Sequence, residues 1–106
     1  MAGQQVGQDL NLEQAQEAAF YCGLNILGQL NMATNKDLED VKNCVKITGY
    51  VNSVDTFVDQ PKIINGASEL LVSVFGENGK HARVAVSVNS LPLGGSVEID
   101  GIFEIN

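Results

Sequence analysis

The final third of the chain contains two stretches in which apolar and polar residues alternate, and this pattern constrains the fold more than any other. One stretch spans residues 82–88 and the other residues 97–103, with Pro92 and the pair Gly94-Gly95 between them. A period of two is typical of β-strands that bury one face. We therefore expect two strands, joined by a turn at Gly94-Gly95 and paired with each other in antiparallel fashion.

Two charged side chains stand out in these stretches. Arg83 alternates with Ala82 and Val84, so we expect its guanidinium to leave the sheet on the face opposite the apolar positions. Glu98 occupies a polar position of the second stretch, and in adjacent strands the two charges would lie close together. On these residues alone, the simplest interpretation is an ion pair between Arg83 and Glu98 that satisfies a partly buried charge.

Size and composition indicate one small domain. The chain has 106 residues, of which 44% are hydrophobic and 18% charged, which suffices for one modest core. Six basic and thirteen acidic residues give a formal net charge of -7, so the surface repels phosphate backbones and we expect no nucleic acid partner. The chain shows neither a basic-then-apolar leader nor an apolar run of membrane-spanning length. We therefore expect no membrane partner and a cytoplasmic location.

The first half of the chain begins with a helical pattern. Residues 1–10 are rich in Gly and Gln and indicate a flexible lead-in. Asn11, with Gln14 three residues later, matches a variant of the capping box that begins a helix. Apolar residues then recur at three- and four-residue spacing, which predicts one buried stripe. Its members are Ala15, Ala19, Cys22, Ile26, Leu27 and Leu30.

A strand and a second helix are expected next. Residues 44–51 are rich in β-branched side chains and predict a strand whose Val45, Ile47, Gly49 and Val51 share one face. Asp55 or Asp59 is placed to cap the second helix, with Pro61 in its first turn and Gly76 to Gly79 at its end. The expected buried stripe of this helix is Ile63, Ala67, Leu70, Leu71 and Val74.

The order helix, strand, helix, strand, strand predicts an α+β fold for residues 11–106, with both helices on one face of a mixed sheet. A helix between two strands favours a right-handed crossover, so the strands beginning at Cys44 and Ala82 are expected to be parallel neighbours. We expect the other face, which would carry Arg83, Glu98 and parts of Thr48 and Tyr50, to have no covering element. In so small a domain an uncovered face favours an oligomer.

Five separated motifs occur in one order along the chain. They are residues 49–53, residues 59–68, Arg83, Leu91-Pro92 and Val97-Glu98-Ile99-Asp100. Together they resemble the YjgF/Rid family of reactive-intermediate imine deaminases, also described as endoribonuclease L-PSP-like. The resemblance runs from about residue 7 to the end of the chain. It implies a chorismate-mutase-like fold, a ferredoxin-like half-sandwich, assembled into homotrimers with ligand clefts between subunits.

The resemblance also implies an activity and a set of site residues. Members of the family hydrolyse small 2-imino or enamine acids, such as 2-aminoacrylate, to 2-keto acids and ammonia. Arg83 matches the arginine that binds the substrate carboxylate, and Glu98 matches the glutamate that places the attacking water. Asn65 matches an asparagine near the cleft, and we expect the backbone amide of Ala85 to contact the ligand. Family chains carry a strand hairpin and a further strand ahead of the first helix, so this chain resembles a member that lacks these strands. An expressed fragment, a natural minimal form and a truncated gene are all consistent with this resemblance.

The chemistry of these residues suits the implied reaction. A planar guanidinium holds a carboxylate through two parallel hydrogen bonds, and an imine carbon is already electrophilic. Positioning and a polarised water then suffice, so we expect no metal, no organic cofactor and no covalent nucleophile. His81, the single histidine, is expected to share a direction with Arg83 only at the frayed start of the strand and to have no catalytic role. The alternative function is a small-carboxylate-binding or scaffold trimer that has lost turnover with the N-terminal strands.

Overall fold

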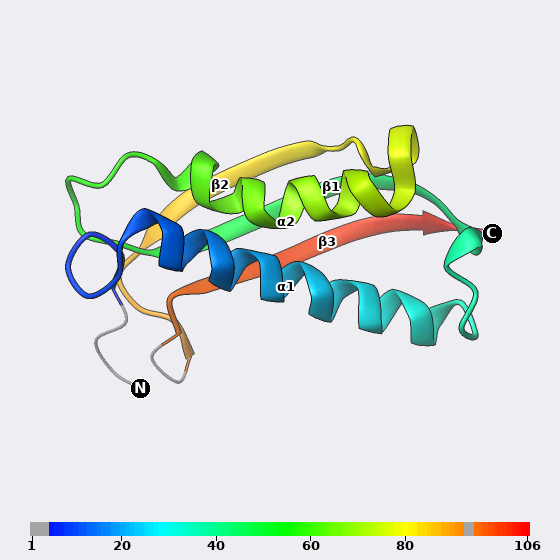
Figure 1. Ribbon diagram of the computed structural model, residues 1–106, viewed down its shortest axis with the longest axis horizontal. Coiled ribbons are helices and arrows are strands. Elements are labelled where there is room, and N and C mark those ends of the chain that lie inside the picture. Colours follow the sequence, from blue (N-terminus) through cyan, green and yellow to red (C-terminus); the bar gives the residue numbers. More distant parts are fainter. Residues whose placement is uncertain (1–4, 93–94) are drawn as a thin grey trace.

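The computed structural model describes residues 5–92 and 95–106, and its elements follow the expected order (Figure 1). They are α1 (Leu12–Ala33), the short 3₁₀ helix η1 (Leu38–Asp40), β1 (Val41–Asn52), α2 (Gln60–Phe75), η2 (Gly76–Gly79), β2 (Ala82–Val88) and β3 (Val97–Ile105). Both helices lie on the same side of a three-stranded mixed sheet (Figure 1), so the α+β prediction is confirmed. The expected turn at Gly94-Gly95 lies partly outside the described residues, as do the first four residues of the lead-in.

Strand β1 occupies the centre of the sheet, whose order is β2-β1-β3. It pairs in parallel with β2 and antiparallel with β3. The parallel prediction is therefore confirmed, whereas the expected pairing of β2 with β3 is wrong, because these are the two outer strands. Tight hairpins use connections of about two to five residues. The connection 89–96 is longer, and the two strands that it joins lie on opposite sides of β1.

The strand register shows that Arg83 lies on the helix-covered face. Arg83 is paired with Ile47, which is fully buried, and paired residues in a sheet point to the same side. The expectation that the guanidinium leaves the opposite face is therefore wrong. Val84 and Val86 occupy that opposite face and are 41% and 39% exposed. Alternation identifies the two faces of a strand, but it does not specify which one meets the helices.

Strand β1 contains a local irregularity that changes one core position. Its pairing with β3 shifts register between Cys44 and Lys46, as a β-bulge does. Cys44 is consequently buried with Ile47, and Val45 is 49% exposed. The expected inward position of Val45 is therefore wrong, whereas Ile47, Gly49 and Val51 are buried as predicted.

The two helix starts follow the local sequence signals. The side chain of Asn11 accepts a hydrogen bond from the amide of Gln14 at 2.8 Å, and the side chain of Gln14 accepts one from the amide of Asn11 at 2.9 Å. This reciprocal capping box confirms the predicted start of α1. Helix α2 begins after Asp59 with Pro61 in its first turn, where a missing N–H leaves no hydrogen bond unmade. Asp59 occupies the expected capping position, but its side chain makes no capping hydrogen bond.

Helices α1 and α2 approach each other closely at Gly66. A methyl group at Gly66 would clash with the carbonyl oxygen of Gln16 on α1. The side-chain amide of Gln16 in turn donates to the carbonyl oxygen of Lys62 at 2.9 Å. These two contacts hold α2 close against α1, and α2 directs Asn65 and Ser68 toward Arg83 on β2.

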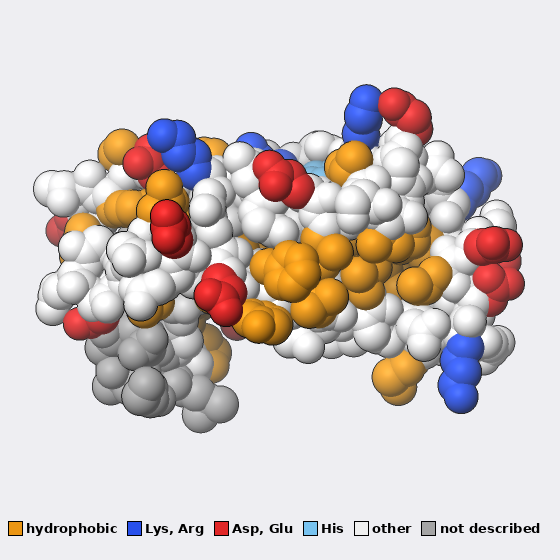
Figure 2. All heavy atoms as spheres, in the orientation of Figure 1, with side chains coloured by type: hydrophobic (Ala, Val, Ile, Leu, Met, Phe, Trp, Pro, Cys, Tyr) orange, Lys and Arg blue, Asp and Glu red, His pale blue; other side chains and the backbone are white. Residues whose placement is uncertain are grey.

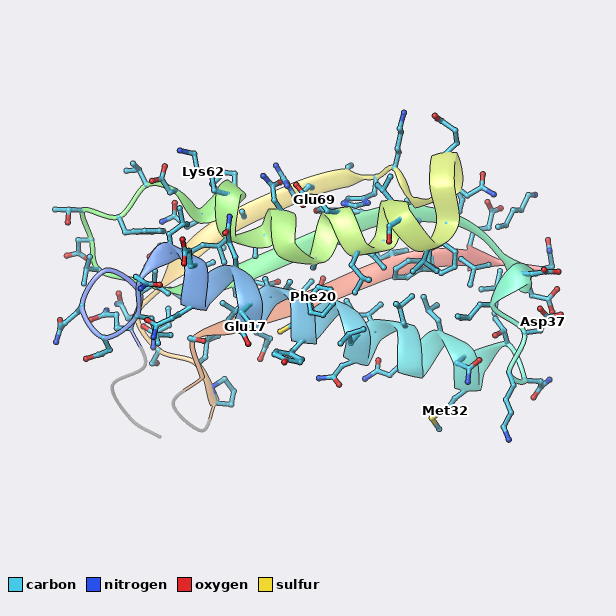
Figure 3. All side chains as sticks on the ribbon, in the orientation of Figure 1. Glu17, Phe20, Met32, Asp37, Lys62 and Glu69 are labelled. Atoms are coloured by element: carbon cyan, nitrogen blue, oxygen red, sulfur yellow. The ribbon has the colours of Figure 1, made fainter. Side chains whose placement is uncertain are left out.

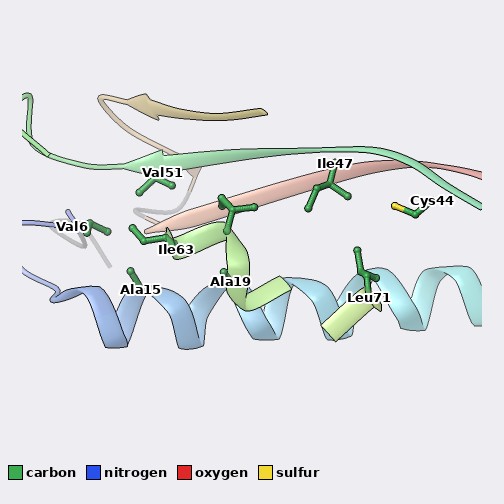
Figure 4. Close-up of a cluster of buried hydrophobic side chains, with 9 residues drawn as sticks. Val6, Ala15, Ala19, Cys44, Ile47, Val51, Ile63 and Leu71 are labelled. Atoms are coloured by element: carbon green, nitrogen blue, oxygen red, sulfur yellow. The ribbon is translucent and has the colours of Figure 1, made fainter. Parts of the chain in front are cut away.

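The core lies between the helices and the helix-covered face of the sheet (Figure 4). Its buried members are Val6, Ala15, Ala19, Cys44, Ile47, Val51, Ile63, Ile64 and Leu71. Val6 comes from the segment before α1. Its amide donates to the carbonyl oxygen of Asn52 at 2.8 Å, and its own carbonyl accepts from Val54 at 3.0 Å. Residues 5–10, which the sequence places in the lead-in, therefore contribute one side chain to the core.

The outer surface of the helical layer carries an apolar patch between α1 and α2 (Figure 2). Phe20 and Val74 are 39% and 43% exposed, and Phe20 projects from the outer surface of α1 (Figure 3). The expected burial of Val74 is therefore wrong, whereas Ile63, Ala67 and Leu71 of the predicted stripe are buried. The exposed side chains of the patch offer no hydrogen-bond donor to an anionic ligand. None of the helices in the described part of the chain is long and apolar enough to span a membrane.

Candidate functional site

Arg83 lies on the outer strand β2, next to helix α2. Its Nη1 donates to the side-chain oxygen of Asn65 and lies 3.5 Å from the hydroxyl oxygen of Ser68. Asn65 and Ser68 are three positions apart on α2, so both present their side chains on the same side of the helix. The structure thus brings together two of the residues that the sequence predicts for the site.

His81 joins this cluster through Ser68. Its Nε2 lies 3.0 Å from the hydroxyl oxygen of Ser68, and its Nδ1 lies 2.5 Å from the carbonyl oxygen of Gly79. Ser68, His81 and Arg83 line a surface hollow of about 390 Å³ together with Val72 and Lys80. The hollow is open, and it combines hydroxyl, imidazole and guanidinium groups.

The guanidinium of Arg83 has no carboxylate partner among the described residues. The ion pairs in that part of the chain join Lys42 to Glu104, Lys62 to Asp59 and Lys80 to Glu77. Neutral oxygens of Asn65 and Ser68 hold the guanidinium instead. The ion pair of Arg83 with Glu98 that the residues alone suggested is therefore absent, and the positive charge is left available to an anion.

Glu98 lies on β3, on the face of the sheet that the helices leave uncovered. It is paired with Tyr50, while Asp100 is paired with Thr48. The hydroxyl of Tyr50 donates to a carboxylate oxygen of Asp100 at 3.3 Å. The negative charge of Asp100, with a smaller contribution from Glu98, raises the pKa of Tyr50. Within one chain, therefore, Glu98 belongs to an acidic group separate from Arg83.

A larger groove, of about 570 Å³, runs between α1 and β3. Its lining includes Cys22, Glu98 and Phe103. The thiol of Cys22 lies 3.7 Å from the carbonyl oxygen of Val97, and burial, together with the charge of Glu98, raises the pKa of this thiol. A protonated thiol is a weak nucleophile, so this groove does not present Cys22 as a reactive group.

Ala85 and the unpredicted pair Ser68 and His81 complete the description of the site. Ala85 follows Arg83 by two residues on the same face of β2, and its side chain packs against the core. Ser68 follows Asn65 by three positions on α2, and His81 precedes Arg83 by two. A spacing of three along a helix places Ser68 on the same side as Asn65. A spacing of two along an extended segment places His81 on the same side as Arg83.

The fold and this cluster define a class of protein: a small α+β domain with two helices on one face of a mixed sheet and a cationic site at the sheet edge. A family model described as "YjgF/chorismate mutase-like, putative endoribonuclease" matches residues 1–103. The chain belongs to this family, and the resemblance inferred from its motifs is confirmed.

Similar proteins include one curated sequence and two crystal structures. Protein TCP17 of Trypanosoma cruzi is 45% identical over 103 residues, which cover 96% of this chain and 64% of that protein. Protein Atu1372 of Agrobacterium tumefaciens, a protein of unknown function, is 48% identical with a TM-score of 0.96, covering 100% of this chain and 67% of that one. A "putative endoribonuclease" of Shewanella oneidensis is 29% identical with a TM-score of 0.91, covering 95% and 66%. The chain thus spans about two thirds of the length of each relative.

Proposed function

We propose that this protein hydrolyses small 2-imino acids and their enamine tautomers, such as 2-aminoacrylate, to 2-keto acids and ammonia. The observation that carries the proposal is the state of Arg83, whose guanidinium is held by neutral oxygens and lacks a carboxylate partner among the described residues. The chain has a formal net charge of -7, so most of its surface repels anions. The guanidinium of Arg83 is therefore a favourable binding position for a small anion.

The hydrogen bonds of Arg83 suit a carboxylate ligand. A guanidinium has five N–H donors in one plane, and the described contacts all involve Nη1. Nη2 and Nε therefore face no described acceptor, and together they present the parallel pair of donors that a carboxylate accepts. A lysine would supply the charge without fixing the plane of the ligand. We assign Arg83 as the substrate anchor, with Asn65 and the backbone amide of Ala85 beside it.

The hydrolysis itself needs few protein groups. Water adds to the electrophilic imine carbon, the carbon–nitrogen bond then breaks, and the nitrogen leaves as ammonia while the carbon keeps the oxygen as a ketone. We assign Glu98 to the water, because a carboxylate accepts a hydrogen bond from it and orients its lone pair toward the carbon.

The proposed cleft lies between copies of the chain. Within one copy Arg83 and Glu98 occupy opposite faces of the sheet, so a site that uses both requires two copies. The uncovered face also exposes Val84, Val86 and Ile102, which a second copy would cover. We propose a homotrimer, in keeping with the family resemblance, and a cytoplasmic location, where Cys22 and Cys44 remain free thiols as they are here.

A second candidate function is carboxylate binding without turnover. The observation that favours it is the separation of Glu98 from Arg83 within one chain, because binding needs only the arginine. Ribonuclease activity, which the family description names, fits poorly with the net charge of -7, since RNA binding normally uses clustered basic residues.

The decisive experiment is the rate of keto-acid release from 2-aminoacrylate generated in the assay by a pyridoxal-phosphate enzyme. We expect the protein to accelerate release above the buffer rate, Arg83→Ala to return it to that rate, and Lys42→Ala, which removes a distant cation, to retain it. A wild-type protein that binds pyruvate without accelerating release would establish the binding function. Equal acceleration above the buffer rate by the wild type and by Arg83→Ala would overturn the assignment of the site.

A further inference from the structure

The cluster around Arg83 is a directed chain of hydrogen bonds. The carbonyl oxygen of Gly79 only accepts, so Nδ1 of His81, 2.5 Å away, must carry the proton. A neutral imidazole protonated on Nδ1 accepts at Nε2, so the hydroxyl of Ser68, 3.0 Å away, donates to it. The oxygen of Ser68 then keeps its lone pairs for Arg83. Each donor and each acceptor in the chain has a defined direction.

The chain of hydrogen bonds starts at a rigid point. Gly79 is buried, and a methyl group there would clash with the carbonyl oxygen of Leu71 in the last turns of α2. Its own carbonyl is therefore held in place by close packing against α2. Through His81 and Ser68, this fixed backbone position extends to the guanidinium of an exposed side chain.

We propose that His81, acting through Ser68, is a positioning residue that holds the guanidinium of Arg83 in the orientation that receives a carboxylate. The proposal rests on the proposed function of Arg83 as the substrate anchor. An arginine on an outer strand has many accessible rotamers, and ordering them opposes ligand binding. A network that orders the side chain in advance removes that cost, so its loss should weaken binding without unfolding the protein.

The composition of the chain makes a direct test possible. Arg83 is the only arginine and His81 the only histidine, so their side-chain signals in an NMR spectrum of ¹⁵N-labelled protein need no separate assignment. In the ligand-free protein we expect the proton of His81 on Nδ1, where the carbonyl oxygen of Gly79 accepts it. We also expect a heteronuclear NOE for Nε–H of Arg83 close to that of the backbone, falling in Ser68→Ala and in His81→Asn.

A matched control separates this role from general effects on α2. Ser73 is a second serine of the same helix, and its hydroxyl donates to the carbonyl oxygen of Leu70 at 3.1 Å instead of reaching β2. Ser73→Ala should leave the Arg83 signal unchanged. Ser68→Thr, which keeps the hydroxyl, should restore the wild-type signal.

The binding arm of the test uses pyruvate, the 2-keto acid product of the proposed reaction, titrated by the same NMR signals. Ser68→Ala and His81→Asn should each weaken pyruvate binding about five-fold, the effect of losing one net hydrogen bond. The double variant should be no weaker than the weaker single variant, because both residues act through one path.

The outcomes distinguish this proposal from the proposed function. Failure of the wild type to bind pyruvate would count against the function of Arg83, while the ligand-free Arg83 signal would still decide the positioning role. An Arg83 signal that is unchanged in both variants, a proton on Nε2 of His81, or additive losses in the double variant would each overturn the positioning role.

Discussion

Arg83 and Glu98 lie on the two outer strands of the sheet and point to its opposite faces. Strand β1 separates them, with Ile47 on the side of Arg83 and Tyr50 on the side of Glu98. A ligand held by Arg83 within one chain is therefore out of reach of the Glu98 of that chain. If both residues act on one substrate, each must come from a different copy.

Mixing two inactive variants tests this arrangement. Arg83→Ala and Glu98→Gln should each lose keto-acid release, and an unfolded and refolded equal mixture should recover it. Random association gives about a quarter of the sites an intact Arg83 from one copy and an intact Glu98 from another. Each variant refolded alone is the control. An inactive mixture whose subunits have exchanged, shown by mass spectrometry of intact oligomers, would contradict the arrangement.

The uncovered sheet face should hold the assembly together. Val86 is 39% exposed on this face beside Tyr50, so Val86→Glu places a charge where a second copy would pack. We expect this variant to sediment as a monomer at micromolar concentration and to lose keto-acid release. Val58→Glu, at a position that is 78% exposed in the connection before α2, is the matched control. Sedimentation of the wild type itself as a monomer would refute the intersubunit cleft.

Two helical glycines should respond to alanine in opposite directions. Gly66→Ala forces α2 away from the carbonyl of Gln16 and should lower the free energy of unfolding by about 1–3 kcal/mol. Gly28 has open space around the same added methyl, so Gly28→Ala should raise that free energy by about 0.5–1 kcal/mol. Urea denaturation followed by circular dichroism measures both. Equal effects of the two substitutions would show that the interhelical contact at Gly66 is not tight.

The buried thiol of Cys44 should make stability depend on pH in the alkaline range. Burial raises the pKa of Cys44 to about 11, from an ordinary value of 9.0 in the unfolded chain. Below pH 9 the thiol is protonated in both states and contributes no pH dependence. Above pH 9 only the unfolded thiol releases its proton, so the free energy of unfolding falls and the loss is complete above about pH 11.

Urea denaturation at several pH values checks this effect. Between pH 9 and 11 the wild type should lose stability more steeply than Cys44→Ala, in which this proton is missing and every other titrating group is retained. Parallel slopes for the two proteins would show that the native thiol ionises as freely as the unfolded one.

Local signals predicted much of this fold because they depend on neighbouring residues. The capping box at Asn11, the start of α2 near Pro61 and the parallel neighbours joined through α2 all follow from spacing or chain direction. The pairing of β3 with β1 and the side on which Arg83 emerges depend on long-range contacts that alternation does not encode. The bulge that exchanges Cys44 for Val45 likewise depends on the register with β3.

The candidate site was predictable to a similar extent. Asn65 and Arg83 were identified by resemblance, and the structure brings them into contact. Ser68 and His81 lie at helical and strand spacing from these two residues, but the sequence does not predict them as site residues, because their hydrogen bond depends on how α2 packs beside β2. The distance between Glu98 and Arg83 depends on strand order, which is why the expected proximity within one chain was wrong.

The central position of β1 also predicts which strands of the sheet open most easily to solvent. Strand β1 is hydrogen-bonded on both sides and contributes Ile47 and Val51 to the core, whereas β2 is bonded on one side only within the chain. Amide protons of β1 should therefore exchange with solvent only through global unfolding, and those of β2 through smaller local openings. The arginine is thus carried on the strand that opens more readily, while the centre of the domain stays closed.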